Sequence, residues 1–584
     1  MRGAATDSGP RPAAAPLRSW GQVDPVVLPP EGALAGAVDP VLLLREGLLP
    51  WRRSGAVTVV LAADPGRAQA HLPLLARELG PVRLAAAAPD RLAEAQRRTL
   101  GPLLARAAEE RCPPWASCRT LPRRRLLAVL ALAAGPAVGL AVTAPAVLVG
   151  LLTGWTLLTL ALLAGLRAAA LMATLRRDRT DAGAEVIPSR WPVVSLLVPL
   201  YREQAVAGHL LRRLGALDYP RDRLEVLLIL EDDDPVTRAA LGAAVLPSWA
   251  QVVEVPEGLL RTKPRALNHA LRLARGTIVG IYDAEDVPAP DHLRRVAARF
   301  ARRGPEVACV QGVLDYFNAR RNWMARCFAL EYAAWFRVLL PGLARLGCPV
   351  PLGGTTLFLR REALEAAGGW DAHNVTEDAD LGLRLARLGY RTEILPIVTE
   401  EEANARPWAW IRQRSRWLKG YAVTYAVHMR DPAQLWREMG SRGFWAVQIL
   451  FLGTLSQFAL APLLWALWLV PFGLAVHPLG GALPERALLA ASGLCLLATV
   501  LDWTVAGLGA RRAGKAGLSL WAPTLPLYFA MGTFAVWRAL AEAVLCPFRW
   551  DKTAHGLDMP TLPRRGAAPS PPVTGRPAPW RRRA

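Results

Sequence analysis

The sequence predicts an α/β domain inserted between transmembrane helices and preceded by a smaller α/β domain. Short β-branched runs alternate with amphipathic helical patterns over residues 189–435, which indicates a mostly parallel sheet covered by helices. Apolar runs flank this region at residues 126–166 and 449–508, and runs of about 20 such residues can span a bilayer. A shorter alternation of strand and helix patterns occupies residues 22–120.

The composition also indicates a membrane protein. The chain has 584 residues, enough for two or three domains, and 52% of them are hydrophobic. The net charge of +22 suits contact with anionic lipid, and no zinc-finger spacing or basic heptad helix predicts nucleic-acid binding. Seven cysteines without a paired framework indicate free thiols in a reducing compartment.

The N-terminal part is expected to fold as a small domain without chemistry of its own. Residues 1–21 are rich in Pro, Ala and Arg, lack the apolar core of a secretory signal and are expected to be disordered. No catalytic cluster occurs over residues 22–120. The expected elements are strands at residues 56–61 and 82–88 and helices at residues 67–79 and 90–108.

Two apolar runs, residues 126–142 and 146–166, are predicted to form a transmembrane hairpin. Arginines precede the first run and follow the second, so the positive-inside rule places both outer ends in the cytoplasm. These arginines are Arg123, Arg124 and Arg125 before the hairpin, and Arg167, Arg176, Arg177 and Arg179 after it. A pair of buried helices in a soluble core is the alternative.

The apolar runs at residues 449–470 and 488–508 predict two more spans, which makes four in all. Residues 518–546 contain two prolines and an Arg–Glu pair at i and i+4, so interfacial or re-entrant helices are expected there. The basic tail, residues 557–584, is expected to be disordered. The topology predicts a multi-pass protein of the bacterial inner (cytoplasmic) membrane with a cytoplasmic central domain.

Five strands are expected in the central domain, with a helix at residues 265–274 before the fourth. They are residues 193–200, 224–230, 251–255, 277–282 and 307–313. Strands of such sheets present functional groups at their carboxyl ends. The fourth strand ends in Asp283, Glu285 and Asp286. Clustered carboxylates suit Mg²⁺ or Mn²⁺, whereas a solvated acidic turn is the alternative that these residues alone leave open.

Several further motifs occur in a fixed order along the central domain. They are Val198–Glu203, Glu231–Asp234, Lys263–Asn268, Pro351–Thr356, Gly368–Asp371, Thr376–Asp378 and Gln413–Trp417. In this order and spacing they resemble the motif series of family 2 glycosyltransferases, in particular the membrane-bound, processive branch that is similar to cellulose synthase. The resemblance covers residues 190–430 and implies a GT-A-type nucleotide-sugar domain that transfers sugars with inversion.

On the donor side, the resemblance implies that Asp283 and Glu285 hold Mg²⁺ or Mn²⁺ against the donor diphosphate. The family pattern is Asp-x-Asp, so the Glu is a departure, and Asp286 lies beyond the motif. The positions that match the nucleotide pocket are Pro199, Tyr201, Glu203, Glu231 and Asp232, the last two ranked equally as uridine contacts. Lys263 could meet phosphate charge, or it could be a solvated lysine at a helix start.

On the acceptor side, the resemblance implies that Asp378 is the general base for the attacking hydroxyl. The helix dipole alone also favours an acidic residue at this helix start. Gln413, Arg416 and Trp417 match the Gln-x-x-Arg-Trp signature, in which Arg can pair with diphosphate and Trp can stack on a sugar. An amphipathic juxtamembrane helix is the alternative for this segment.

Two weaker resemblances lie outside the central domain. Residues 43–51 and the strand after them resemble the N-terminal domain of type II secretion ATPases, which implies a docking module with a protein partner. Residues 547–556 resemble the gating loop of cellulose and hyaluronan synthases.

The expected function is transfer of a sugar from a nucleoside-diphosphate sugar, UDP-linked by resemblance, to a growing β-linked polysaccharide. A single addition to a lipid or a short glycan is the alternative within the same class. A non-catalytic membrane docking factor is the alternative from another class, and the carboxylates of Asp283, Glu285 and Asp378 argue against it.

Overall fold

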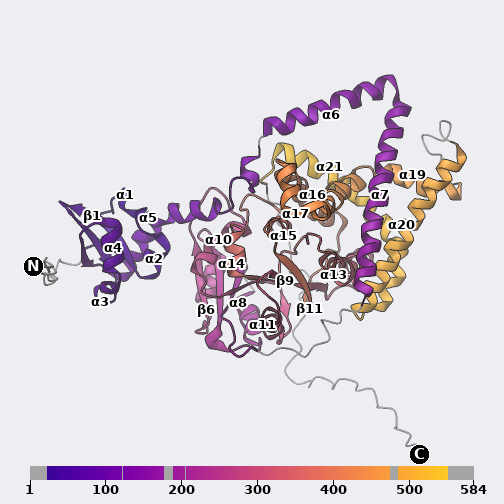
Figure 1. The fold of residues 1–584 in the computed structure, drawn as a ribbon. Helices are drawn as coiled ribbons and strands as arrows, with labels where there is room; N and C mark the ends of the chain where they lie inside the picture. The colour runs from indigo at the N-terminus through magenta and orange to yellow at the C-terminus, as the bar shows by residue number, and fades with distance from the viewer. Residues whose placement is uncertain (1–22, 122, 177–187, 204–205, 474–483, 550–584) are drawn as a thin grey trace, which may run out of the picture.

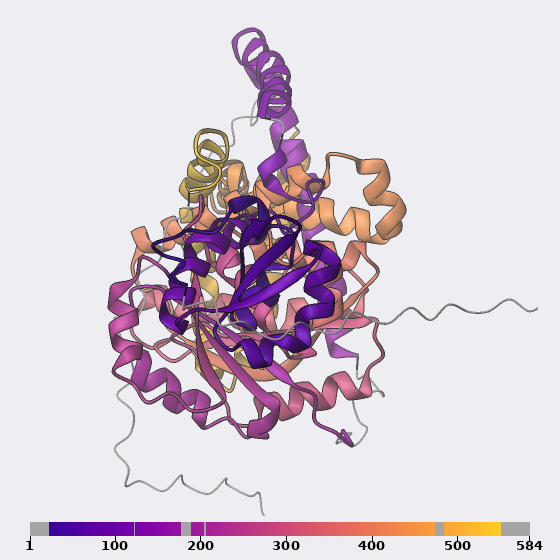
Figure 2. The same ribbon diagram turned by 90° about the vertical axis from the view of Figure 1, so that its left-hand side faces the viewer.

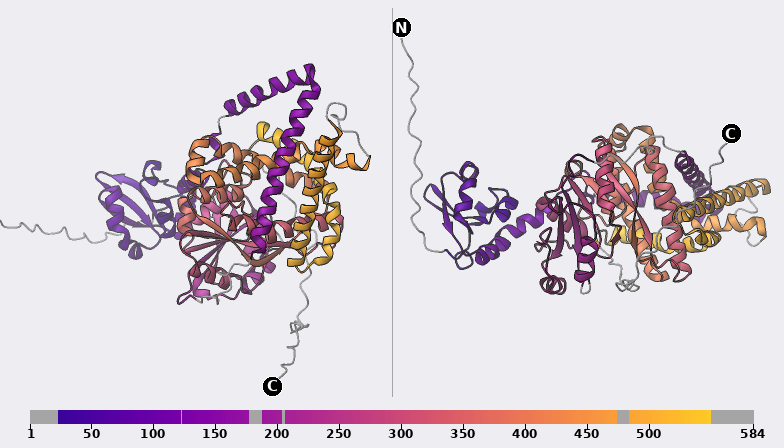
Figure 3. Two further views of the ribbon diagram at one scale, coloured as in Figure 1. Left: turned by 45° about the vertical axis from the view of Figure 1, so that its right-hand side comes forward. Right: turned by 90° about the horizontal axis from the view of Figure 1, so that it is seen from below.

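A computed structural model shows the arrangement of the chain (Figure 1). It describes all residues except 1–22, 122, 177–187, 204–205, 474–483 and 550–584. The predicted disordered ends, and the gating-like loop beyond residue 549, lie outside the described residues. The small N-terminal domain lies at one end, the large sheet in the middle and the long apolar helices at the other end, as Figures 1 and 3 both show.

The N-terminal domain contains a three-stranded sheet in the order β1-β2-β3 (Figure 2). β2 (Val57–Ala62) pairs in parallel with β3 (Val82–Ala86), and both strands were predicted. β1 (Leu48–Ser54) was not predicted, because Pro50 and two arginines mask its pattern; it is an antiparallel edge strand, where such residues are tolerated. The helices are α1 (Gly32–Ala35), α2 (Pro40–Arg45), α3 (Pro65–Ala68), α4 (Leu72–Leu79) and α5 (Pro89–Glu109).

The central domain is built on an eight-stranded sheet in the order β6-β5-β4-β7-β10-β9-β11-β8. The strands are β4 (Val194–Leu200), β5 (Leu224–Glu231), β6 (Ala250–Val255), β7 (Ile278–Ile281), β8 (Val287–Pro288), β9 (Val307–Tyr316), β10 (Leu357–Arg360) and β11 (Arg391–Glu401). The first four in the order are parallel, as predicted. The other half is mixed, because β10 runs antiparallel to both β7 and β9 and β8 runs antiparallel to β11.

Helices cover both faces of this sheet. On β4, Leu197 packs into the core under α10 (Lys263–Leu273), whereas Leu196 and Val198 pack into the core under α11 (His292–Arg302). Adjacent side chains of a strand point to opposite faces, so a strand buried on both faces reads as one continuous apolar run. The remaining helices around the sheet are α8 (Val206–Gly215), α9 (Pro235–Gly242), α14 (Arg361–Ala366) and α15 (Glu377–Arg387).

Within the described residues, three helical segments are long and apolar enough to cross a membrane: residues 145–175, 323–345 and 485–512. The first and third are α7 (Pro145–Leu175) and α20 (Glu485–Arg512), which contain the predicted runs 146–166 and 488–508. The predicted span at 449–470 stays a prediction. That region belongs to two helices bent by 67°, Pro432–Ala459 and Ala461–Phe472, which would make a fourth span if taken together.

Two other segments expected at the membrane are not candidate spans within the described residues. The predicted run 126–142 lies on α6 (Arg123–Thr143), of which only Ala134–Thr143 forms a described apolar stretch, shorter than a span. Residues 516–545 form a 3₁₀ turn followed by α21 (Leu525–Leu545), which is not among the candidate spans of the described chain. The interfacial role expected for this last segment stays a prediction.

Segment 323–345 is the most buried of the three candidate spans, and α7 and α20 pack against it. It consists of α12 (Trp323–Ala334), a π-helical turn and α13 (Leu340–Arg345), and 61% of its apolar window is buried, against 22% for α7 and 28% for α20. A Cβ on Gly342 would lie 2.2 Å from the carbonyl oxygen of Ala170 on α7, and a Cβ on Gly509 of α20 would lie 2.6 Å from Ala333. Glycine at these two positions therefore allows α7 and α20 to pack closely against segment 323–345.

Candidate active site

One large cavity joins the carboxyl ends of the parallel strands to the apolar helices. Its volume is about 980 Å³. The predicted site residues that line it are Pro199, Tyr201, Glu203, Glu231, Lys263, Asp283, Glu285, Asp378, Gln413, Arg416 and Trp417. Asp232 is not among the lining residues; its side chain is 53% exposed and lies 3.6 Å from Arg238. Glu231 and Asp232, ranked as equals from the sequence, therefore face different surroundings.

Lys263 lies in the first turn of α10 and contacts the acidic turn after β7. Its Nζ lies 2.5 Å from Oδ1 of Asp283 and donates to the carbonyl of Gly354 at 2.8 Å. Burial by itself would lower the pKa of Lys263, but Asp283, Glu377 and Asp378 outweigh it and raise that pKa. The side chain is 18% exposed, so the solvated-lysine alternative is wrong.

Asp286 holds the acidic turn in shape from beneath. It is 1% exposed, and its Oδ2 accepts the backbone N–H of Asp283 at 2.8 Å and the hydroxyl of Thr355. The solvated-turn alternative therefore does not describe Asp286. Its other oxygen, Oδ1, is buried without a hydrogen-bond partner.

The donor set of this turn fits a divalent cation bound together with substrate oxygens. Burial raises the pKa of Glu401, and Asp286, Glu285 and Asp283 raise it further, so negative charge is in excess here. Oε1 of Glu401 is buried without a hydrogen-bond partner. No group of three acidic, His or Cys side chains in the described chain is arranged as a complete metal site. Mg²⁺ commonly binds through one or two carboxylates and completes its shell with phosphates and water.

Asp378 lines the same cavity, at the first turn of α15. Its Oδ1 accepts the N–H of Ala379 at 2.8 Å. A Cβ on Gly354 would lie 3.2 Å from Oδ2 of Asp378 and 3.8 Å from Nζ of Lys263, so this glycine separates the two groups without filling the space. Burial raises the pKa of Asp378; it also raises the pKa of Glu377 to about 8, with repulsion from Asp378 contributing. A carboxylate with a raised pKa suits a general base near neutral pH.

α16 (Pro407–His428) brings the Gln-x-x-Arg-Trp side chains to the same cavity. Nη1 of Arg416 donates to the carbonyl of Val375 at 3.2 Å, just before α15. The ring of Trp417 lies 6.2 Å from Tyr332 and 6.4 Å from Phe328, centroid to centroid. The motif therefore faces the cavity rather than only a membrane surface.

Sequence reasoning missed Arg414, which lies inside this motif. Its guanidinium pairs with Glu331 at 2.6 Å and lies 4.8 Å from the ring centres of both Trp410 and Trp417. The ion pair links positions 83 residues apart, and a local pattern carries no signal of such a partner.

Glu231, at the end of β5, pairs with Arg265, a buried residue that was not predicted to belong to the site. Arg265 is fully buried, and its Nη2 lies 2.5 Å from Oε2 of Glu231. Burial raises the pKa of Glu231, and Arg265 opposes that shift. The neighbouring loop after β4 is fixed as well, because the N–H of Glu203 donates to the hydroxyl of Thr237 at 2.9 Å.

The chain is similar to known glycosyltransferases. Residues 278–505 match the family model described as Glycosyl transferase family group 2. The chain is 32% identical over 302 residues to a beta-monoglucosyldiacylglycerol synthase of Synechocystis sp., covering 49% of this chain and 59% of the relative. It is 27% identical over 263 residues to probable glucomannan 4-beta-mannosyltransferase 1 of Arabidopsis thaliana, covering 44% of this chain and 45% of that one.

Among solved structures, the mannosyltransferase PcManGT from Pyrobaculum calidifontis, in complex with GDP-Man and Mn²⁺, shares 24% identity with a TM-score of 0.43. The match covers 66% of this chain and 97% of that one. The chain spans 45% to 59% of the length of the two curated relatives named above. The family expected from the motif series is confirmed at the level of the group, while the processive branch stays a prediction. Residues 278–505 therefore resemble the catalytic domain of family 2 glycosyltransferases.

Proposed function

We propose that the protein is a membrane-bound, inverting glycosyltransferase that moves a sugar from a nucleoside-diphosphate sugar, UDP-linked, to an acceptor hydroxyl. One observation carries the proposal: Lys263 and Asp283 face Asp378 across Gly354 in a single cavity. Groups for a leaving diphosphate and a base for an attacking hydroxyl thus line the same cavity.

On the donor side, Pro199, Tyr201, Glu203 and Glu231 would hold the nucleotide at the ends of β4 and β5. Asp283 and Glu285 would hold Mg²⁺ or Mn²⁺, which when bound supplies Lewis-acid neutralisation of the diphosphate. The ammonium of Lys263 adds positive charge where the leaving group develops negative charge.

On the acceptor side, Asp378 would accept the proton of the hydroxyl as its oxygen attacks the anomeric carbon. In such a direct displacement the base and the leaving diphosphate would lie on opposite faces of the sugar, which would invert the anomeric centre. An α-linked donor would give a β-linked product.

The acceptor best supported by the cavity is a membrane lipid with a free hydroxyl. The part of the cavity lined by the long helices is apolar except for Arg167 and Asp502, which pair at 2.8 Å. Its lining there includes Leu163, Leu166 and Ala170 of α7, Val505 and Ala506 of α20, and Leu525 and Phe529 of α21. Aliphatic walls suit acyl chains better than hydrated sugars. Relatives whose names specify glucosyldiacylglycerol synthesis support the same acceptor class.

A growing β-linked polysaccharide is the second candidate acceptor. The placement of Trp417 beside Tyr332 and Phe328 in the cavity favours it, because aromatic faces can stack on sugar rings. The relatives named as glucomannan mannosyltransferases support this class.

The membrane orientation follows from the basic ends of two helices. The carbonyl of Thr174, at the end of α7, accepts from Arg345 at 3.0 Å and from Arg512, at the end of α20, at 3.4 Å. These adjoining basic ends would be cytoplasmic by the positive-inside rule, and the central domain would then face the cytoplasm of a bacterial cell.

Purified protein in nanodiscs, supplied with Mg²⁺ or Mn²⁺ and a panel of UDP- and GDP-sugars, tests these proposals. Released nucleoside diphosphate reports transfer, and mass spectrometry reports the product. One sugar on added diacylglycerol supports the lipid acceptor, whereas a ladder on an oligosaccharide supports the polymer. Full complementation of a deletion by Asp378→Asn would instead favour a non-catalytic docking factor.

A further inference from the structure

We propose that the N-terminal domain is a positioning part of the transferase site, through α5 and residues 110–121, and not only a docking module. The inference rests on the proposed function and deepens it. Two separate contacts carry it, one beneath the nucleotide pocket and one beside the loop that leads to Asp378. Neither contact lines the cavity, so the residues involved would act through their neighbours.

The first contact joins the last residue of α5 to the nucleotide pocket. Oε1 of Glu109 accepts the N–H of Leu260 at 3.0 Å and lies 3.8 Å from Nη1 of Arg265. The other end of that guanidinium binds Glu231. A Cβ on Gly258 would lie 2.5 Å from Oε1 of Glu109, so the loop backbone presses directly against the N-terminal domain.

That loop matters because it carries residues of the cavity wall. It connects β6 to α10, and Arg261, Thr262 and Lys263 at its end all line the cavity. Its anchor to Glu109 is thus three residues from Lys263. Loss of the anchor would free the backbone that presents this lysine to the donor diphosphate.

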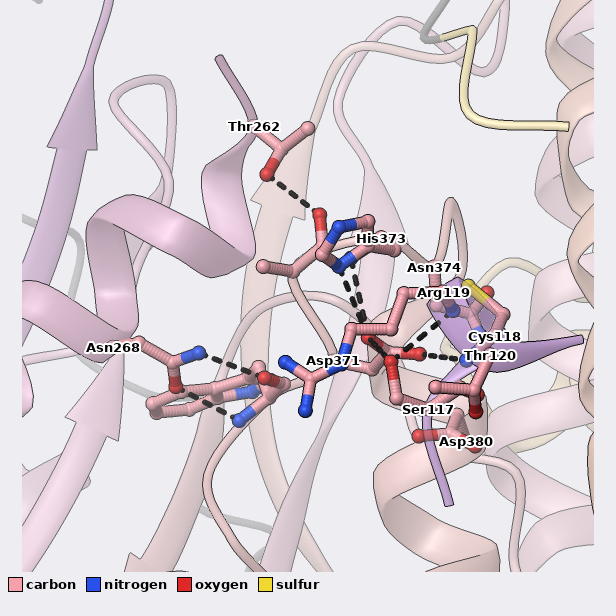
Figure 4. Close-up of polar contacts among 12 residues, drawn as sticks. Ser117, Cys118, Arg119, Thr120, Thr262, Asn268, Asp371, His373, Asn374 and Asp380 are labelled. Carbon is pink, nitrogen blue, oxygen red and sulfur yellow. Dashed lines mark hydrogen bonds and ion pairs between the residues drawn. The ribbon is translucent and has the colours of Figure 1, made fainter. Parts of the chain in front are cut away.

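The second contact centres on Asp371, which is fully buried (Figure 4). Oδ1 accepts the hydroxyl of Ser117 at 2.8 Å, and Oδ2 accepts the N–H of Cys118 at 2.7 Å. Burial would raise the pKa of Asp371, but hydrogen bonds from His373, Cys118 and Ser117 lower it to about 2. The ionised carboxylate of Asp371 is therefore fixed between residues 110–121 (the linker) and the loop that leads into α15.

The same loop holds both sides of the candidate site. The hydroxyl of Thr262, next to Lys263, donates to the carbonyl of Ala372 at 2.9 Å (Figure 4). The loop then runs through Thr376 into α15, where Asp378 lies. The Ser117–Asp371 contact therefore sits seven residues before the proposed base.

Further contacts make the linker a fixed part of the central domain. Asn268 of α10 donates to the carbonyls of Ala108 and Trp370 at 2.9 and 2.7 Å, and its Oδ1 accepts the N–H of Trp370 (Figure 4). Beyond α16, Arg430 donates to the carbonyl of Ser117 at 2.8 Å and to the hydroxyl of Thr120 at 2.9 Å. These donors and acceptors form hydrogen bonds between the N-terminal part and the central domain, so moving the two apart would leave them without partners.

Two variants test the proposal through different kinetic constants. Glu109→Ala removes the acceptor of the Leu260 N–H and should raise the donor KM about five-fold or more with kcat little changed. Glu109→Gln keeps an acceptor oxygen and should restore the donor KM. Ser117→Ala should lower kcat about five-fold with the donor KM little changed. Glu94→Ala is the matched control, because Glu94 lies on α5 and pairs with Arg98 at the surface.

Hydrogen exchange gives a readout that does not need the correct sugar donor. Peptides over residues 256–262 should exchange faster in Glu109→Ala, and peptides over residues 371–378 should exchange faster in Ser117→Ala. Wild-type kinetics and exchange in both variants would overturn the proposal. So would an equal loss of kcat and donor affinity in both, with the thermal midpoint lowered, since that pattern reports only a weakened fold. Failure of the proposed function itself would show as absent transfer in the wild type.

Discussion

Nζ of Lys263 lies 2.5 Å from Oδ1 of Asp283, which places an ammonium against the first carboxylate of the acidic turn. The lysine comes from the start of a helix and the aspartate from the end of a strand, 20 residues apart. The pair neutralises a carboxylate before any donor is present. A divalent cation at Asp283 would therefore displace the ammonium toward the diphosphate.

Lys263→Met should lower kcat/KM for the nucleotide sugar about 100-fold, because it removes a preorganised charge at the leaving group. Released nucleoside diphosphate measures the effect. Arg294→Met is the control in the same domain; Arg294 of α11 pairs with Asp218 at the surface and should be replaceable. An unchanged kcat/KM in Lys263→Met would contradict the assignment.

Chelation of divalent ions should abolish transfer, and Mn²⁺ or Mg²⁺ should restore it. Asp283→Asn and Glu285→Gln should each raise the metal concentration needed for half-maximal rate about ten-fold or more, since each removes a charged oxygen ligand. The measurement is a metal titration at fixed donor. Full activity in excess chelator would exclude the metal role of this pair.

Asp378→Asn should lower kcat about 1,000-fold and leave the donor KM near its wild-type value, because a positioned base contributes factors of this order. Asparagine can still accept the N–H of Ala379, so the start of α15 should persist. A matched fall in kcat for Glu377→Gln would move the base assignment to the neighbouring residue.

The raised pKa values at the start of α15 predict two opposite pH effects. A base works when ionised, so the transfer rate should fall as pH falls through the raised pKa of Asp378. For Glu377, the folded protein retains a proton up to about pH 8 that the unfolded chain loses near 4.5. Burial of its charge therefore costs stability as pH rises across that window. Glu377→Gln should raise the thermal midpoint at pH 8 and change it little at pH 5.

Much of the candidate site was predictable because its chemistry sits at strand and helix ends. Asp283 follows a short buried strand and Asp378 begins an amphipathic helix, and the parallel strands bring such ends to one edge of the sheet. The exclusion of Asp286 from the predicted metal pair stays a prediction; its side chain is buried.

The rest depended on contacts between distant parts of the chain. β10 is a four-residue strand with three apolar residues, a run too short for periodicity to separate from a helix. β11 is interrupted by Pro396, near a shift in its pairing register. Arg265 and Arg414 find their carboxylate partners 34 and 83 residues away. The bend at residue 460 and the burial of residues 323–345 arise from packing that no local hydropathy window records.

The apolar half of the cavity gives the sharpest test of the acceptor. Thr454 of α18 (Thr454–Ala459) lines it and is only partly buried, so a larger side chain there would fill the cavity space. Thr454→Trp should lower transfer to a lipid acceptor about ten-fold or more, because overpacking at this position competes with an acyl chain. The donor KM and the slow hydrolysis of donor by water should be unchanged, since the nucleotide pocket lies at the other end. Leu497→Trp is the matched control, because Leu497 of α20 is 67% exposed. Equal transfer to diacylglycerol in Thr454→Trp and in the wild type would mean that lipid does not enter through this half of the cavity, and it would favour a glycan acceptor bound beside Trp417.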